Sequence, residues 1–178
     1  MTWFRCGMKK GTDDAVLNSL IDRTITTITS HVTTIGTSAL RSCHELISAT
    51  FDEATSVGTT AFYDCTALTN ITIPKVVTIG SNAFQLSPVL NNLVLDKVEL
   101  INSSAFASCR SLDNVTLKAS SMCVLNNVNA FSGTAFASDG TGGTIYVPSD
   151  LVSTYEANAT WAALLALNAN NSIQAITT

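Results

Sequence analysis

A unit of 22 residues repeats along this chain, and the repetition limits the available folds more than any other feature of the sequence. The clearest copy begins at Val57, and copies in the same register lie before and after it. The aligned columns are Ile35, Val57, Ile79 and Ile101; Ala39, Ala61, Ala83 and Ala105; Leu40, Phe62, Phe84 and Phe106; and Leu46, Leu68, Leu90 and Leu112. A fixed period over four copies predicts a solenoid of stacked coils, in which each coil packs only against its neighbours.

Each copy contains a short alternation of polar and apolar residues. In residues 70–73, Asn-Ile-Thr-Ile, the isoleucines alternate with polar residues, and Pro74 follows them. Alternation with a period of two predicts a strand that is buried on one face only, and the proline predicts its end. A second short strand is expected over residues 76–79, so each coil should contribute two strands.

A glycine column follows the second strand and consists of Gly36, Gly58, Gly80 and, in the last copy, Asn102. Glycine and asparagine are the residues that adopt positive φ most readily, so the column predicts a turn with positive φ at this position. Serine and threonine follow the column and predict side-chain capping of a short helix or turn that carries the Ala-Phe pair. The alanine predicts a close approach between coils, and the phenylalanine predicts an interior position.

The repeat is stretched towards its C-terminal end. The pair Ala130-Phe131 follows Ala105-Phe106 by 25 residues, with residues 122–125 in the place of a strand. Residues 138–143 are rich in glycine and are interpreted as a flexible loop between repeats. Residues 145–148, Ile-Tyr-Val-Pro, repeat the pattern of a strand followed by proline and predict the final coil.

Both ends of a solenoid need a cover, because the terminal coils would otherwise expose their core and strand edges. Residues 13–21 have an acidic start and helical apolar spacing, which predicts an N-terminal helix, and residues 149–155 and 161–167 predict two C-terminal helices. We therefore predict one solenoid domain over residues 13–178, preceded by a tail or attachment segment. Its expected parts are that tail in residues 1–12, a cap and degenerate coil in 13–34, repeats in 35–148 and a C-terminal helical cap in 149–178.

Composition and charge exclude several classes of protein. The chain has 178 residues, of which 46% are hydrophobic and 12% charged, enough apolar residues for a continuous core. A net charge of −4 disfavours nucleic-acid partners, since their phosphates require basic surfaces. The longest apolar run, residues 161–167, has seven residues, whereas a membrane-spanning helix needs about 20. No membrane insertion and no signal peptide are expected.

The cysteines are interpreted as packing residues. Three of the five, Cys43, Cys65 and Cys109, occupy one repeat column whose fourth member is Ser87. Column members point the same way in stacked coils, which suits small buried thiols better than disulfides. A zinc site is the alternative, but the cysteines and histidines lack the C-x2-C and H-x3-H spacings of such sites. We therefore expect no metal.

The sequence of residues 68–84, Leu-Thr-Asn-Ile-Thr-Ile-Pro-Lys-Val-Val-Thr-Ile-Gly-Ser-Asn-Ala-Phe, resembles the BspA-like (Treponema-type) leucine-rich repeat. The resemblance covers roughly residues 24–148. This chain departs from the repeat at Leu40, Ser87, Asp96, Asn102 and Lys118. The resemblance implies an α/β solenoid, namely a right-handed leucine-rich-repeat superhelix with parallel strands, short helical turns and capping helices. It also implies a cell-surface adhesin or binding protein without catalytic residues.

The flanking segments are similar to those of short repeat proteins from gut Gram-positive bacteria and their phages. The opening segment is residues 20–30 and the closing segment begins at residue 145. This similarity implies an extracellular, cell-surface or virion-associated protein whose partner is a surface protein or a glycan.

Catalysis and cofactor binding are not expected. The two histidines, His31 and His44, have no serine or cysteine nucleophile motif nearby, and His44 is interpreted as a surface residue. Residues 140–143 are glycine-rich but lack the lysine of a phosphate-binding loop. We predict that the protein is not an enzyme and that it needs no cofactor.

The candidate ligand-binding residues alternate with the buried residues of the strands and should therefore face outwards. We name them the outward ladder: Ser48, Thr50, Asn70, Thr72, Asn92, Val94, Asn114 and Thr116. They form a polar surface that is almost uncharged, on which a glycan or a protein could bind. The alternative is a solvated strand surface on which the asparagine side chains stack against one another.

The sequence thus predicts a non-enzymatic ligand-recognition or adhesion module. The alternative is a structural spacer or assembly protein with no ligand of its own. Such a spacer would join an assembly, or copies of itself as a homo-oligomer, through Trp3, Phe4 or the C-terminal apolar helix.

Overall fold

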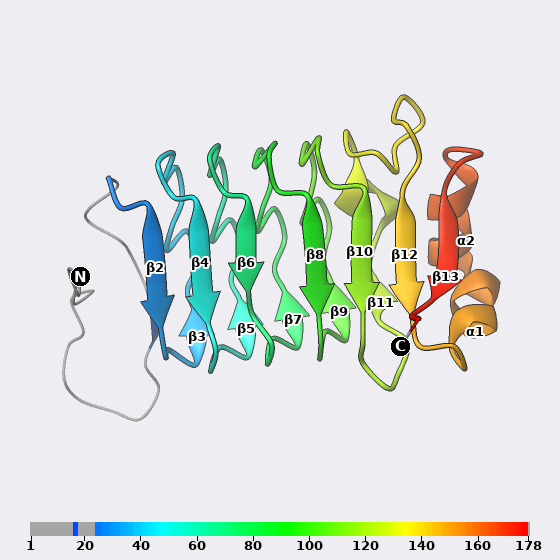
Figure 1. Cartoon of the computed structure of the whole chain (residues 1–178), viewed down its shortest axis with the longest axis horizontal. Helices are drawn as coiled ribbons and strands as arrows, with labels where there is room; N and C mark the ends of the chain where they lie inside the picture. The colour runs from blue at the N-terminus through cyan, green and yellow to red at the C-terminus, as the bar shows by residue number, and fades with distance from the viewer. Residues whose placement is uncertain (1–15, 18–23, 178) are drawn as a thin grey trace.

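The computed structural model describes residues 16–17 and 24–177, with side chains from residue 24 onwards. The described residues form an elongated solenoid in which parallel strands stand side by side along the long axis (Figure 1). The predicted architecture of stacked coils with parallel strands is confirmed. The expected tail, residues 1–12, lies outside the described residues.

The longer strands form one face of the solenoid. These ladder strands are β2 (Thr27–Ser30), β4 (Ser48–Phe51), β6 (Asn70–Thr72), β8 (Asn92–Leu95), β10 (Asn114–Leu117), β12 (Thr144–Val147) and β13 (Ser172–Ala175). They pair in the orders β2-β4-β6 and β8-β10-β12-β13, and β6 and β8 lie next to each other in the same row (Figure 1). In β4, β6, β8, β10 and β12, buried residues alternate with exposed or half-buried ones, as the sequence predicted.

The shorter strands form a second sheet, ordered β1-β3-β5-β7-β9-β11. They are β1 (Val16–Leu17), β3 (Thr34–Ile35), β5 (Ser56–Val57), β7 (Thr78–Ile79), β9 (Leu100–Ile101) and β11 (Val124–Leu125). Every coil from β2 to β11 therefore contributes one long and one short strand. The predicted N-terminal helix over residues 13–21 is wrong at Val16–Leu17, which pairs as a parallel strand with Thr34–Ile35. The apolar residues have helical spacing, but pairing with the next coil favours a strand at this position.

Phenylalanine rings form a continuous stack through the core. Phe62 and Phe84 stack with ring centroids 4.9 Å apart, and Phe84 stacks on Phe106 at 5.4 Å. Phe131 continues the stack at 5.5 Å from Phe106. All four rings are fully buried, as the repeat column predicted. Stacked aromatic pairs add about 0.5–1.5 kcal/mol beyond the area that they bury, so each coil is bound to the next at this point.

The Ala-Phe segments are turns rather than helices, and positive φ occurs at two positions in each turn. One column is Ser38, Thr60, Asn82 and Ser104, and the other is Ser42, Asp64, Leu86 and Ser108. The φ angles of these residues lie between 54° and 62°. Four of the eight are serine, and Asp64 and Asn82 have the short polar side chains that suit the left-handed region best.

The predicted positive φ of the glycine column is wrong, and the reason for glycine is close packing between coils. Among the described glycines only Gly133 and Gly142 have positive φ. A Cβ atom on Gly58 would lie 2.7 Å from the backbone carbon of Gly36 in the preceding coil, and Gly80 has the same relation to Gly58. The glycines therefore allow backbone of adjacent coils to touch.

Asn102 shows how the coils accommodate a side chain in the glycine column. The backbone hydrogen bond from Asn102 to Ile79 measures 3.0 Å, whereas the equivalent bonds from Gly58 and Gly80 measure 2.8 Å. The phenylalanine stack widens from 4.9 Å to 5.4 Å between the same coils. The Asn102 amide also donates to the Ile79 carbonyl oxygen at 3.0 Å, so the wider gap is bridged by a side chain.

The C-terminal cap combines two helices with a strand. Helix α1 (Val152–Ala157) leads directly into α2 (Ala159–Ala166), and the Asn158 side chain accepts hydrogen bonds from the first backbone N–H groups of α2. Both helices were predicted. The strand β13 was not, and it extends the row of ladder strands beyond β12. A 3-10 helix η1 (Val128–Phe131) precedes β12.

Two aromatic residues of the cap bind the backbone of the last stretched coil. The Cys123 N–H donates to the Tyr155 hydroxyl oxygen at 2.7 Å, and the Trp161 indole N–H donates to the Cys123 carbonyl oxygen at 2.8 Å. Both aromatic side chains are fully buried. The cap therefore satisfies polar backbone groups of the stretched coil as well as covering its core. Within the part of the chain that the structure describes, no helix has the length and apolar character needed to span a membrane.

Candidate functional site

The structure arranges the outward ladder as two straight columns across neighbouring strands. In the first column Ser48 pairs in register with Asn70, and Asn92 pairs with Asn114. In the second column Thr50 pairs with Thr72, and Val94 pairs with Thr116. All eight residues are exposed or half-buried, whereas the strand residues between them are buried. Their role in ligand binding remains a prediction.

Six further residues belong to the same two columns and were missed by the sequence reasoning. They are Thr27, Thr144 and Ser172 in the first column, and Thr29, Tyr146 and Gln174 in the second. The alternation of Ile145 and Val147 around Tyr146 was a signal that could have identified part of this set. Tyr146 is the aromatic residue of the extended ladder, and it lies between Thr116 and Gln174.

The three ladder asparagines do not stack by hydrogen bonding to one another. Each donates its amide to the preceding residue of its own strand region: Asn70 to Thr69 at 2.9 Å, Asn92 to Asn91 at 3.4 Å and Asn114 to Asp113 at 2.7 Å. Among the described residues no hydrogen bond joins the side chains of Asn70, Asn92 and Asn114 to one another. Each of these bonds uses one of the two amide N–H donors, so the side-chain oxygen and the second N–H remain for a ligand on this face.

Charged residues cluster just beyond the ends of the ladder strands and pair between successive coils. Lys75 contacts Glu53 at 2.7 Å, and Lys118 contacts Asp96 at 3.2 Å. These exposed pairs contribute little to stability, about 0–1 kcal/mol each. The two ladder columns themselves, from Thr27 to Gln174, contain no charged residue.

Within residues 24–177, the histidines pair with aspartates and the cysteines are buried. His31 is bound to Asp52 at 2.7 Å and His44 to Asp64 at 2.9 Å, and both histidines are exposed. Burial raises the pKa of the Cys109 and Cys123 thiols to about 12, so both remain protonated and poorly nucleophilic near neutral pH. Among the described residues there is no group of three or more His, Cys, Asp or Glu side chains placed to hold a metal ion.

The cysteine column is buried. Cys43, Cys65 and Cys109 have almost no solvent exposure, as the packing interpretation predicted. The Cys65 thiol donates to the Leu40 carbonyl oxygen at 3.1 Å. The column therefore contributes hydrogen bonds between coils rather than disulfides.

Comparison with known proteins supports the repeat architecture. The sequence model of the family described as the BspA type leucine rich repeat region matches residues 18–139 in six copies. No protein with a curated description matches the chain.

Solved structures of leucine-rich repeat proteins have a similar fold. The similar structures include a leucine-rich repeat protein from Bacteroides ovatus, with 22% identity, a TM-score of 0.58, and 85% of this chain and 36% of that chain covered. The leucine rich repeat protein of T. pallidum has 20% identity and a TM-score of 0.62, with 76% of this chain and 65% of that one covered. A leucine rich cell surface protein from Faecalibacterium prausnitzii has 20% identity and a TM-score of 0.56, with 86% of this chain and 33% of that one covered. This chain thus spans from one third to two thirds of the length of these proteins.

Proposed function

Since the chain belongs to the BspA-type leucine-rich repeat family, we propose that it is a non-enzymatic recognition or adhesion module. Its ligand is a protein or glycan of a host or cell surface, and the outward ladder is the surface that binds it. Such a module acts outside the cell that makes it, on the surface of a cell or of a virion. The similar protein from Faecalibacterium prausnitzii is described as a cell surface protein, which supports this location.

The observation that carries the proposal is the regular, uncharged polar surface formed by the ladder strands. Seven parallel strands place side chains of Thr, Ser, Asn and Gln, together with Val94 and Tyr146, in two columns. Adjacent strands in a sheet are about 4.8 Å apart, so equivalent groups recur at that interval along the solenoid. An extended ligand with polar groups at a similar repeat can bind several coils at once.

The ladder is also rigid, which favours binding. Every ladder side chain is attached to a strand whose inward neighbours are fixed in the core, for example Val115 between Asn114 and Thr116. A surface that is ordered before binding loses little conformational entropy when the ligand arrives. The acceptor oxygens of Asn70, Asn92 and Asn114 are presented by this surface at successive coils, where hydroxyl or amide donors of a ligand can reach them.

The experiment measures binding of the purified, fluorescently labelled chain to cultured epithelial cells, by flow cytometry, and to printed arrays of glycans. The double variant Asn70→Asp with Asn92→Asp adds two negative charges to the centre of the ladder. The matched control is Thr37→Asp with Thr59→Asp, which adds the same charge at two exposed turn positions of adjacent coils. We expect the ladder variant to lose binding and the control to keep it.

Equal binding by the two double variants would contradict the assignment of the ladder as the ligand face. Absence of binding to cells and to glycans by the unmodified chain would favour the spacer function instead. In that case the solenoid would serve to separate or join other parts of an assembly.

A further inference from the structure

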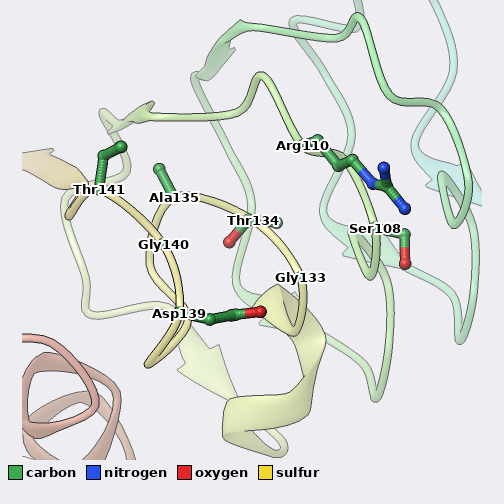
Figure 2. Close-up of a pocket in the computed structure, with 8 residues that line it drawn as sticks. All are labelled: Ser108, Arg110, Gly133, Thr134, Ala135, Asp139, Gly140 and Thr141. Atoms are coloured by element: carbon green, nitrogen blue, oxygen red, sulfur yellow. The ribbon is translucent and has the colours of Figure 1, made fainter.

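A hollow of about 400 Å³ lies beside the turns that lead into the ladder strands, between the fourth coil and the stretched fifth coil. Arg110 and Ser108 line it on one side, and the loop that contains Asp139 and Thr141 lines it on the other (Figure 2). A second hollow of about 220 Å³ shares Arg110 and Ser108 and continues past Leu86 and Pro88. We call the larger hollow the Arg110 pocket.

The loop that forms one wall of this pocket is held in place by asparagines of the C-terminal cap. The Asn168 amide donates to the Gly140 carbonyl oxygen at 2.7 Å, and the Asn170 amide donates to the Thr141 carbonyl oxygen at 3.2 Å. The Asn171 side chain accepts from the Gly143 N–H at 2.9 Å. The interpretation of residues 138–143 as a flexible loop is therefore wrong, because long-range hydrogen bonds fix its backbone.

The glycines of the same loop are required by close packing. A Cβ atom on Gly140 would lie 2.3 Å from the Ala135 carbonyl oxygen, and one on Gly142 would lie 2.3 Å from the Asn170 Cβ. Within the loop the buried Thr134 hydroxyl donates to the Phe131 carbonyl oxygen at 2.6 Å. The wall is thus formed before any ligand binds, which lowers the entropic cost of binding.

The groups that line the pocket are complementary to a ligand with one carboxylate and several hydroxyl groups. Among the described residues no carboxylate forms a salt bridge with Arg110, and its side chain is exposed. A guanidinium binds a carboxylate through two parallel hydrogen bonds, and the Ser108 hydroxyl is on the same side. The Asp139 carboxylate on the facing loop is an acceptor for hydroxyl donors.

The backbone of the pocket supplies further donors. Gly133 and Thr141 line the pocket, and in the described part of the chain their N–H groups make no hydrogen bond within the protein. Oxygen atoms of a ligand can accept from these groups. The charges of Arg110 and Asp139 cancel, so the pocket has no net charge. A phosphate or sulfate carries more negative charge than a monocarboxylate and is therefore disfavoured relative to it.

We propose that the Arg110 pocket binds a carboxylated sugar, of the uronic or sialic acid class, with the carboxylate on Arg110 and Ser108 and the hydroxyl groups on Asp139 and the loop backbone. A volume of about 400 Å³ lies within the range of small-molecule sites and suits one such sugar unit. The pocket shares no residue with the outward ladder, so this site is additional to the proposed ligand face.

The test uses the full chain and isothermal titration calorimetry with three sugars: N-acetylneuraminic acid, glucuronic acid and glucose. We expect saturable binding of at least one of the acids and none of glucose, which lacks the carboxylate. Arg110→Ala should weaken the binding by roughly tenfold or more, because a charge-assisted hydrogen-bonded pair is lost. Lys97→Ala, which removes another exposed cation, is the matched control and should bind as the unmodified chain does.

Two further measurements show whether a loss of sugar binding is due to the pocket, to loss of folding or to the outward ladder. Arg110 is exposed, so Arg110→Ala should keep the melting temperature of the unmodified chain. The ladder variant Asn70→Asp with Asn92→Asp should keep its sugar binding even where cell binding is lost. Failure of both acids to bind, equal binding of glucose, or undiminished binding by Arg110→Ala would each overturn the proposal.

Discussion

The Ser87 hydroxyl donates a hydrogen bond of 3.1 Å to the carbonyl oxygen of Phe62, which belongs to the preceding coil. Cys109 forms the same bond with Phe84, from thiol to carbonyl oxygen, at 3.0 Å. Serine and cysteine therefore have the same role in this column: each donates a hydrogen bond from a buried position to the backbone of the preceding coil. The apparent exception in the cysteine column is a conservative replacement in terms of hydrogen bonding.

Ser87→Ala is expected to destabilise the protein by about 1–3 kcal/mol, because it removes a buried donor from a carbonyl acceptor. Ser87→Cys keeps a donor at the same place and should change the free energy of unfolding much less. Urea unfolding followed by circular dichroism measures both values. Equal stability of the alanine variant and the unmodified chain would show that the bond contributes nothing.

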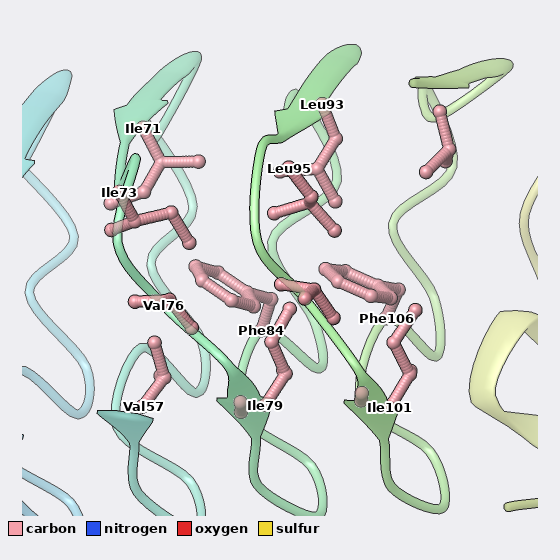
Figure 3. Close-up of a cluster of buried hydrophobic side chains, with 14 of the residues drawn as sticks. Val57, Ile71, Ile73, Val76, Ile79, Phe84, Leu93, Leu95, Ile101 and Phe106 are labelled. Carbon is pink, nitrogen blue, oxygen red and sulfur yellow. The ribbon is translucent and has the colours of Figure 1, made fainter. Parts of the chain in front are cut away.

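Phe84→Ala is expected to lower the free energy of unfolding by about 3–5 kcal/mol. The ring belongs to the buried hydrophobic cluster of the core (Figure 3) and stacks on the phenylalanines of both neighbouring coils. Phe84→Leu should cost less than half as much, since Leu40 fills the same column in the first copy. Thermal and urea unfolding would test this order, and an alanine variant as stable as the leucine variant would contradict it.

Gly58→Ala is expected to destabilise the protein by about 1–3 kcal/mol through overpacking of two backbones. Gly58→Asn should be at least as harmful, because its Cβ meets Gly36 at the same distance of 2.7 Å. Urea unfolding measures the stability of both variants. An alanine variant as stable as the unmodified chain would contradict close packing as the reason for glycine in this column.

The repeated part of this fold was predictable because its packing is periodic. A residue such as Phe62 or Leu68 meets the same environment in every coil, so its column is visible in the sequence alone. The alternation within residues 70–73 likewise placed the ladder on the outer face correctly. Periodicity did not reveal why glycine occurs at Gly58, since steric contact and positive φ both select glycine.

The features that the sequence did not reveal depend on contacts that occur once. The strand β13 follows two helices and has no repeat partner in sequence, yet it pairs with β12 over four residues. The wall of the Arg110 pocket requires Asn168 and Asn170 to reach residues 28 or 29 positions earlier. Such contacts have no period and no local signal, so only the folded structure shows them.

Alkaline pH is expected to destabilise the protein through its buried thiols. Burial raises the pKa of Cys109 and of Cys123 from 9.0 to about 12, and the pKa of Tyr155 from 10.0 to about 12. Below about pH 9 the folded and unfolded chains are both protonated, and stability does not depend on these groups. Between about pH 9 and 12 the unfolded chain releases these protons first, so the free energy of unfolding falls.

The fall should reach up to about 1.4 kcal/mol per pH unit for each group within this window. Urea unfolding at one-unit steps from pH 7 to pH 11 measures it. Cys109→Ser keeps a donor but does not ionise in this range, so its stability should fall less steeply above about pH 9. Identical slopes for the serine variant and the unmodified chain would show that ionisation of this thiol is not coupled to unfolding.

The cap is expected to depend on the two hydrogen bonds that it makes with Cys123. Tyr155→Phe keeps the packed ring but leaves the Cys123 N–H without its acceptor in a buried position. An unpaired buried polar group costs about 1–3 kcal/mol, so we expect a loss of that size in urea unfolding. Trp161→Phe removes the donor to the Cys123 carbonyl oxygen and should also be destabilising.

Tyr63→Phe is the matched control for the loss of a tyrosine hydroxyl. The Tyr63 ring is half-buried beneath the Arg41 guanidinium, and no hydrogen bond of its hydroxyl occurs among the described residues. Its change in stability should stay within about 0.5 kcal/mol. Because Tyr155 and Trp161 bind the same backbone residue, their effects should not be additive in the double variant. Full additivity would indicate that the two side chains act separately, and that the cap does not hold the last coil as one unit.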